Sequence, residues 1–137
     1  MRFGILGPLW VGGDVATITA GRDRTVLAML LLHAGHVVPI ADLIDAVWNG
    51  RPPATARGQL HTCVSRLRRA ISGAARADEL IRTEPTGYRC EPRPDELDSQ
   101  VFDRLVAEAR AAVEAKDWSL GRQRYRAALR LWRGPAL

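Results

Sequence analysis

Residues 54–72 carry the pattern that most restricts the fold of this chain. At about 100° per residue, the rotation of an α-helix, Leu60, Val64, Leu67 and Ile71 fall on one side of this segment. The opposite side carries small, polar and cationic residues and no acidic one: Thr55, Gly58, Gln59, Thr62, Ser65, Arg66 and Arg69. The segment is therefore expected to form a helix that buries its apolar side in a core and exposes its basic side.

The positive charge of the chain is concentrated around this helix. The net charge is +5, and Lys116 is the only lysine, so nearly all cations are arginines. Between Asp45 and Asp78 there is no acidic residue, and six arginines lie there: Arg51, Arg57, Arg66, Arg68, Arg69 and Arg76. A guanidinium group suits phosphates and guanine edges, so this field predicts a surface that faces nucleic acid. The alternative is an ordinary basic face that contacts only solvent.

The residues before this helix predict a small sheet and two further helices. Residues 2–20 alternate short apolar runs with glycines, which is typical of a small antiparallel sheet with tight turns. A first helix is expected from about residue 22 to residue 34, and a second from about Pro39 to Trp48. The run Asn49–Pro53 then breaks the chain before the basic helix.

A β-hairpin is expected directly after the basic helix. Residues 80–83 and 88–91 predict two short strands joined by a turn over residues 84–87, with Arg82 and Arg89 on the hairpin. Sheet, three helices and hairpin is the order of a winged helix-turn-helix with an added N-terminal sheet. We therefore predict an α+β fold for residues 1–93, in which the hairpin is a wing beside a helix that enters the major groove.

An all-α domain is expected over residues 94–137, after a linker at residues 92–96. Two amphipathic helices, at about 99–115 and 119–132, resemble one unit of a tetratricopeptide-like repeat. One such unit cannot bury its apolar faces alone, so this helical part is expected to be incomplete.

Several other classes of protein are not supported by the sequence. No apolar run approaches the roughly 20 residues of a membrane span, and no signal peptide is recognisable, so a cytoplasmic location is expected. Cys63 and Cys90 are too few for a disulfide framework or a zinc site, and the histidines offer no set of metal ligands. No phosphate-binding glycine loop and no catalytic set is suggested by spacing. We therefore expect no enzyme activity, cofactor or metal.

Several stretches resemble the OmpR-type winged helix and the bacterial transcriptional activation domain of the Streptomyces antibiotic regulatory protein family: Leu43–Trp48, Pro52–Arg57, Leu60, Val64–Ala70, Thr86–Tyr88 and Leu129–Leu137. The resemblance covers essentially the whole chain. It implies a transcriptional activator of a biosynthetic gene cluster that binds direct repeats in double-stranded DNA as a dimer or side-by-side pair. It also implies a contact with RNA polymerase or its σ subunit.

The resemblance further implies which residues form the site. Residues that face the groove fall by position on Gln59, Thr62, Cys63, Ser65 and Arg66. Arg68 and Arg69 fall toward phosphates, Arg89 falls on the wing, and Arg57 borders the same face. The loop that in this fold can contact polymerase matches Asn49, Gly50 and Arg51. Two positions depart from the family: Pro39 replaces a serine or threonine helix cap, and Gly58 replaces a longer side chain that contacts DNA.

Two hypotheses about function follow from these observations. The first is a sequence-specific DNA-binding regulator, with Arg66 as the residue that reads a base. The second is a helical-repeat module for protein interaction without specific DNA binding, in which basic residues near the C-terminus meet an acidic partner: Arg122, Arg124, Arg126, Arg130 and Arg133. A gel shift and a pull-down on one preparation would separate them.

Overall fold

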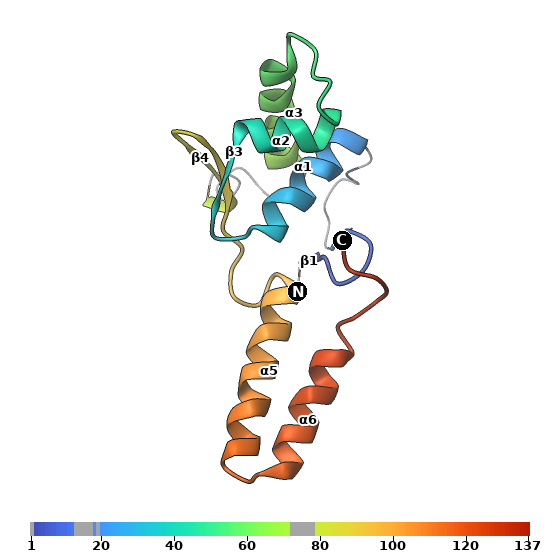
Figure 1. Ribbon diagram of the computed structural model, residues 1–137, viewed down its shortest axis with the longest axis vertical. Helices are drawn as coiled ribbons and strands as arrows, with labels where there is room; N and C mark the ends of the chain where they lie inside the picture. The colour runs from blue at the N-terminus through green and yellow to red at the C-terminus, as the bar shows by residue number, and fades with distance from the viewer. Residues whose placement is uncertain (1, 13–17, 19, 72–78) are drawn as a thin grey trace. The chain divides into compact units, whose positions relative to one another are not determined.

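The computed structural model describes residues 2–12, 18, 20–71 and 79–137 (Figure 1). The chain divides into two compact units. Residues 13–92 form the first, called here the winged-helix unit. Residues 1–12 and 93–137 form the second, called the helical unit.

The winged-helix unit has the predicted order of elements. Its helices are α1 (Gly21–Leu32), α2 (Ile40–Trp48) and α3 (Ala56–Ile71), and its strands are β3 (Val37–Pro39), β4 (Ile81–Glu84) and β5 (Gly87–Cys90). The three helices and the β4–β5 hairpin confirm the winged helix-turn-helix expected from the sequence. Pro39 precedes α2 without a side-chain capping hydrogen bond, as its missing hydroxyl requires.

The strand β3 was not predicted. It pairs antiparallel with β5, which pairs antiparallel with β4, so the wing is the larger part of a three-stranded sheet of order β3-β5-β4. In this register Val38 lies opposite Tyr88, and Tyr88 lies opposite Thr83. A strand of three residues that leads directly into a helix is too short to show an alternating pattern in the sequence.

The core of this unit lies between the three helices, which contact one another pairwise. Leu60, Val64, Leu67 and Ile71 of α3 are each at most 1% exposed, which confirms the predicted apolar stripe. Leu27, Leu30 and Leu31 of α1 and Leu43 of α2 are equally inaccessible to solvent. Because its apolar side is fully covered, the opposite side of α3 is the one that can meet a ligand.

The helical unit is built on α5 (Asp98–Glu114) and α6 (Trp118–Leu129), which pack antiparallel along each other (Figure 1). The short strands β1 (Phe3–Gly4) and β2 (Trp10–Val11) pair antiparallel, as predicted for the N-terminal sheet. The part of that predicted sheet over residues 13–17 and 19 lies outside the described residues.

The N-terminal strands pack with the helical unit, whereas the sequence led us to expect them in the winged-helix domain. Asp98, at the start of α5, accepts hydrogen bonds from the backbone N–H groups of Ile5 (2.8 Å) and Leu6 (3.0 Å). The backbone N–H of Arg133 donates to the carbonyl of Leu6 at 2.8 Å. The first compact unit ends at Pro92, and residues 2–12 belong to the second.

None of the helices in the described ranges is long and apolar enough to cross a membrane. Over the same residues, no group of three or more His, Cys, Asp or Glu side chains could hold a metal ion.

Candidate nucleic-acid interface

Along the middle of the exposed side of α3 lies a strip formed by Gly58, Thr62, Ser65 and Arg69, which we call the exposed strip. Its first three side chains are small, so another surface can approach the helix backbone closely. A Cβ atom at Gly58 would meet nothing within 4 Å. Thr62 Oγ1 donates to the carbonyl of Gly58 at 3.1 Å. The strip ends in the exposed cation of Arg69.

One border of the exposed strip is joined to the wing. Arg68 donates from Nε and Nη2 to the carbonyl of Ile81 (3.1 and 2.7 Å) and from Nη2 to Thr83 Oγ1 (2.9 Å). His61 Nδ1 shares a hydrogen bond with the hydroxyl of Tyr88, and burial raises the pKa of that phenol above its usual value. These contacts fix the wing against α3, so the two elements present one continuous surface.

The other border is joined to α1. Arg66 donates from Nε and Nη2 to the two carboxylate oxygens of Asp23, both at 2.9 Å. Arg22 donates from Nη1 to Gln59 Oε1. The hydrogen bonds from Arg66 hold the pKa of the Asp23 carboxyl below its usual range, so Asp23 is ionised at neutral pH.

The prediction that Cys63 faces the groove is wrong. Its side chain is 1% exposed between α3 and α1, so it cannot contact a groove. Burial, and then the neighbouring Asp23, raise the pKa of its thiol to about 11. The error arises because residue 63 lies at the edge of the apolar stripe, where a helical wheel alone does not show what the next helix covers.

The other predicted residues divide into exposed and engaged side chains. Thr62, Ser65 and Arg69 lie on the exposed strip, and Arg57 is exposed on the wing side. Gln59, Arg66 and Arg68 are held by neighbouring elements: Arg22, Asp23 and the strand β4. Arg89, on the wing, pairs with Glu84 and Glu91 at 3.1 Å each, so its charge is balanced within the sheet.

The loop before α3 is exposed as expected. Asn49, Gly50 and Arg51 are all open to solvent. Asn49 and Gly50 adopt left-handed backbone conformations, with φ of 50° and 77°, which end α2 sharply.

Sequence reasoning missed three residues of this surface. His61 is not among the predicted site residues, although it lies one turn from Arg57 and from Ser65 on the same side of α3. Arg22 and Asp23 precede α3 by more than 30 residues, so only the folded structure brings them to it. The helical spacing of His61 could have identified it from the sequence. No sequence pattern indicates the contacts of Arg22 and Asp23 with α3.

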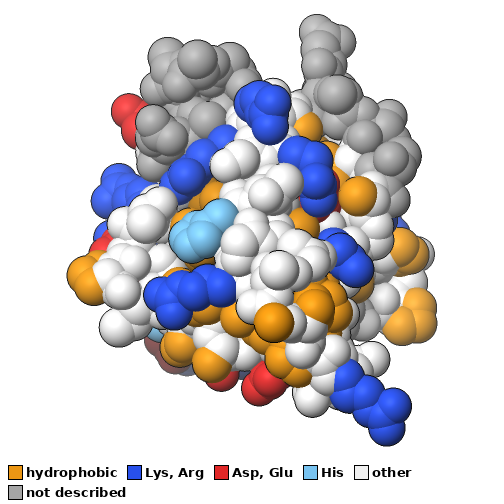
Figure 2. Space-filling model, turned by 90° about the horizontal axis from the view of Figure 1, so that it is seen from above, with side chains coloured by type: hydrophobic (Ala, Val, Ile, Leu, Met, Phe, Trp, Pro, Cys, Tyr) orange, Lys and Arg blue, Asp and Glu red, His pale blue; other side chains and the backbone are white. Residues whose placement is uncertain are grey.

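The face seen in Figure 2 carries basic side chains spread over its surface, with acidic side chains mostly toward its margins. Every charged residue of α3 is an arginine. The helix α3 itself has no acidic residue, so its own charge attracts a polyanion.

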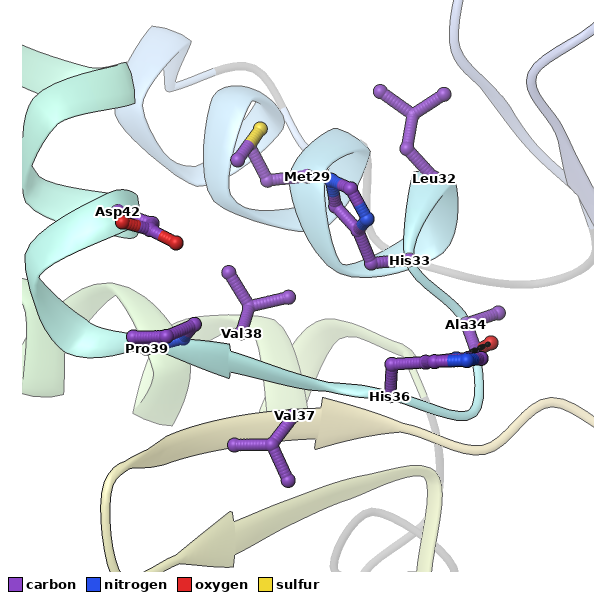
Figure 3. Close-up of a pocket in the computed structure, with 9 residues that line it drawn as sticks. All are labelled: Met29, Leu32, His33, Ala34, His36, Val37, Val38, Pro39 and Asp42. Carbon is purple, nitrogen blue, oxygen red and sulfur yellow. Dashed lines mark hydrogen bonds between the residues drawn. The ribbon is translucent and has the colours of Figure 1, made fainter.

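A separate pocket of about 300 Å³ lies between the end of α1, β3 and the start of α2 (Figure 3). It is lined by Met29, Leu32, His33, Ala34, His36, Val37, Val38, Pro39 and Asp42. None of these residues belongs to α3, so the pocket is distinct from the exposed strip.

Comparison with known proteins agrees with this geometry. Residues 16–90 match the family model described as transcriptional regulatory protein, C terminal, and residues 97–137 match that of the bacterial transcriptional activator domain. The regulatory protein DnrI of Streptomyces peucetius is 38% identical over an alignment that covers all of this chain and 53% of that protein. The transcriptional regulator RedD of Streptomyces coelicolor is 35% identical, with all of this chain and 40% of that protein covered.

A solved structure also matches. It is described as Mycobacterium tuberculosis EmbR in complex with a low affinity phosphopeptide, with a TM-score of 0.92 and 33% sequence identity. The match covers 99% of this chain and 37% of that one, and this chain spans about half or less of the length of the relatives named above. The winged helix, the helical unit and these matches together show that the chain belongs to the Streptomyces antibiotic regulatory protein family.

Proposed function

We propose that the chain is a sequence-specific DNA-binding transcriptional activator whose helix α3 enters the major groove. The observation that carries this proposal is the exposed strip, with small side chains at Gly58, Thr62 and Ser65 and a cation at Arg69, on a helix whose reverse side is fully buried. Small side chains let a helix approach base edges, and arginines reach bases and flanking phosphates.

The residues take different roles in this proposal. Thr62 and Ser65 face base edges, where a hydroxyl can donate or accept. Arg57 and Arg69 meet phosphates on the two sides of the groove. The wing, held to α3 by Arg68, lies along the adjacent backbone.

The proposed partners follow from the family and from the exposed loop. The chain binds direct repeats as a side-by-side pair, and the exposed residues Asn49, Gly50 and Arg51 contact RNA polymerase or its σ subunit. The match of residues 97–137 to the bacterial transcriptional activator domain supports activation rather than repression. Control of an antibiotic biosynthetic gene cluster is the physiological role that this family suggests.

Selection of bound sites from random duplex DNA tests the proposal directly. We expect enrichment of one short motif, repeated in the same orientation at a spacing close to a whole number of helical turns. Recovery of DNA without any enriched motif would contradict sequence-specific binding.

The substitution Arg69→Ala is expected to weaken binding to all duplexes by a similar factor. A cation that meets a phosphate contributes through the release of counterions, so the slope of log K against log salt should fall by about 1. The measurement is a salt titration of duplex affinity. Arg110→Ala, which removes an exposed arginine from α5, is the matched control and should leave the slope unchanged. Equal slopes of log K against log salt for the two variants would show that Arg69 does not contact a phosphate.

The substitution Gly58→Ala is expected to stabilise the protein and to weaken its binding to DNA. Glycine in a helix costs about 0.5–1 kcal/mol relative to alanine, and a Cβ atom at Gly58 meets nothing in the free protein. The added methyl group would however occupy the space that the DNA approaches. Urea unfolding and duplex affinity of the same variant test both effects, and a variant that is more stable and binds as well as the parent would exclude close approach at this position.

A second function, as a protein-interaction module, is favoured by the outer side of α6. Trp118 and Leu129 are 61% and 65% exposed, and Arg122 and Arg126 are exposed beside them. If purified RNA polymerase binds the chain while duplex DNA does not, this function replaces the first.

A further inference from the structure

Asp23 and Arg66 form a bidentate ion pair on the candidate interface. Asp23 lies in the first turn of α1 with its side chain 8% exposed, whereas the side chain of Arg66 is 46% exposed. Two parallel hydrogen bonds of 2.9 Å join the Nε edge of the guanidinium to the carboxylate. This fork geometry fixes the plane of the guanidinium as well as its position.

The contact leaves one edge of Arg66 available. A guanidinium has five N–H donors, and Asp23 accepts one from Nε and one from Nη2. A weaker contact of 3.5 Å joins Nη2 to the sulfur of Cys63. Within the described part of the chain, the Nη1 group of Arg66 has no acceptor. The end of the guanidinium that bears Nη1 is therefore free to donate to the O6 or N7 atom of a guanine.

A second contact from α1 acts on the same border of α3. Arg22 donates to Gln59 Oε1 and lies over the ring of Trp48, with its Cζ atom 5.3 Å from the ring centroid. Gln59 Nε2 donates to Thr55 Oγ1 at 2.8 Å. Gln59 and Arg66 are two turns apart on α3, so consecutive residues of α1 hold both polar side chains at this border.

We propose that Asp23 is a positioning residue for DNA sequence discrimination, which holds Arg66 so that its free edge reads a guanine. The inference rests on the proposed DNA-binding function and adds a determinant that lies outside α3. An arginine already held in one rotamer loses less freedom when it meets a base. The nearby carboxylate also repels phosphate, so Arg66 contributes little to binding that is independent of sequence.

The test compares the parent chain with Asp23→Asn, Arg66→Ala and the double variant. The probes are the duplex recovered by selection and a scrambled duplex of the same length and composition. We expect each single variant to reduce the ratio of the two affinities by about tenfold to a hundredfold. The double variant should resemble the single ones, because both substitutions remove the same contact. Asp45→Asn, an exposed acid of α2, is the matched control and should keep the ratio of the parent.

Two results would overturn the inference. If Asp23→Asn bound both duplexes more tightly and kept the ratio of their affinities, Asp23 would only neutralise the charge of Arg66. An unchanged ratio in Asp23→Asn without tighter binding would show that Arg66 needs no support. A parent chain that does not prefer the selected duplex would instead reject the proposed function itself.

Arg66→Lys decides the question if Asp23→Asn fails to fold. A lysine keeps a cation opposite Asp23 but has no second planar edge. We expect this variant to lose discrimination about as much as Arg66→Ala does, with little change in affinity for the scrambled duplex. Full discrimination in Arg66→Lys would overturn the inference.

Discussion

Replacing Asp98 by alanine is expected to lower the free energy of unfolding of the helical unit by about 3–5 kcal/mol. The carboxylate is 3% exposed and accepts the N–H groups of Ile5 and Leu6. Hydrogen bonds to a charged group contribute about 1.5–3 kcal/mol each, and their loss leaves two donors without an acceptor. The position of Asp98 in the first turn of α5 adds a favourable interaction with the helix dipole.

Urea unfolding and amide hydrogen exchange measure this effect. The N–H groups of Ile5 and Leu6 should exchange much faster in Asp98→Ala than in the parent chain, because the carboxylate is what protects them. Asp103→Ala removes an exposed acid from the same helix and should change the free energy of unfolding by less than about 0.5 kcal/mol. Unchanged protection of the two amides in Asp98→Ala would show that residues 2–12 are held by their other contacts alone.

The sequence predicted the elements whose pattern is local. The stripe of Leu60, Val64, Leu67 and Ile71 repeats at helical spacing over about three turns, so the buried side of α3 could be assigned without coordinates. The wing was predicted because its turn residues lie between two short segments, 80–83 and 88–91, that are typical of strands. The helices α5 and α6 have the same kind of amphipathic repeat and were also predicted.

The remaining features depend on contacts between distant parts of the chain. The strand β3 exists because Val37 and Val38 pair with residues about 50 positions later. Residues 2–12 pack with α5 through the buried carboxylate of Asp98, and no periodic pattern carries that information. The burial of Cys63 likewise depends on α1, which covers one border of α3.

The same contacts reduce the number of side chains on α3 that are not engaged by neighbouring elements. A helical wheel places Gln59 and Arg66 on the basic side of α3, whereas in the structure α1 engages both of them and the wing engages Arg68. The exposed strip between these borders keeps the small residues and Arg69. If α3 binds DNA as proposed, these held side chains lose less conformational freedom when they meet a base, which favours discrimination between sequences.

Replacing Gly87 by alanine is expected to disrupt the sheet that holds the wing and to abolish DNA binding. A Cβ atom at this position would lie 1.9 Å from the carbonyl oxygen of Val38 and 3.0 Å from the Cα atom of Pro39. Both are backbone atoms, so β3 and β5 would have to separate, at a cost of about 3 kcal/mol or more. Because β3 leads directly into α2, the damage would reach the support of α3.

Gly58→Ala is the matched control, because the same methyl group added at Gly58 meets nothing within 4 Å. Urea unfolding should therefore show opposite changes: Gly87→Ala less stable than the parent, and Gly58→Ala more stable. Duplex affinity separates the causes further, since Gly87→Ala loses binding with its fold, whereas Gly58→Ala loses affinity while folded. If Gly87→Ala kept the stability of the parent, the pairing of β3 with β5 would not be a structural support of the wing. The sheet would then have no part in presenting α3 to DNA.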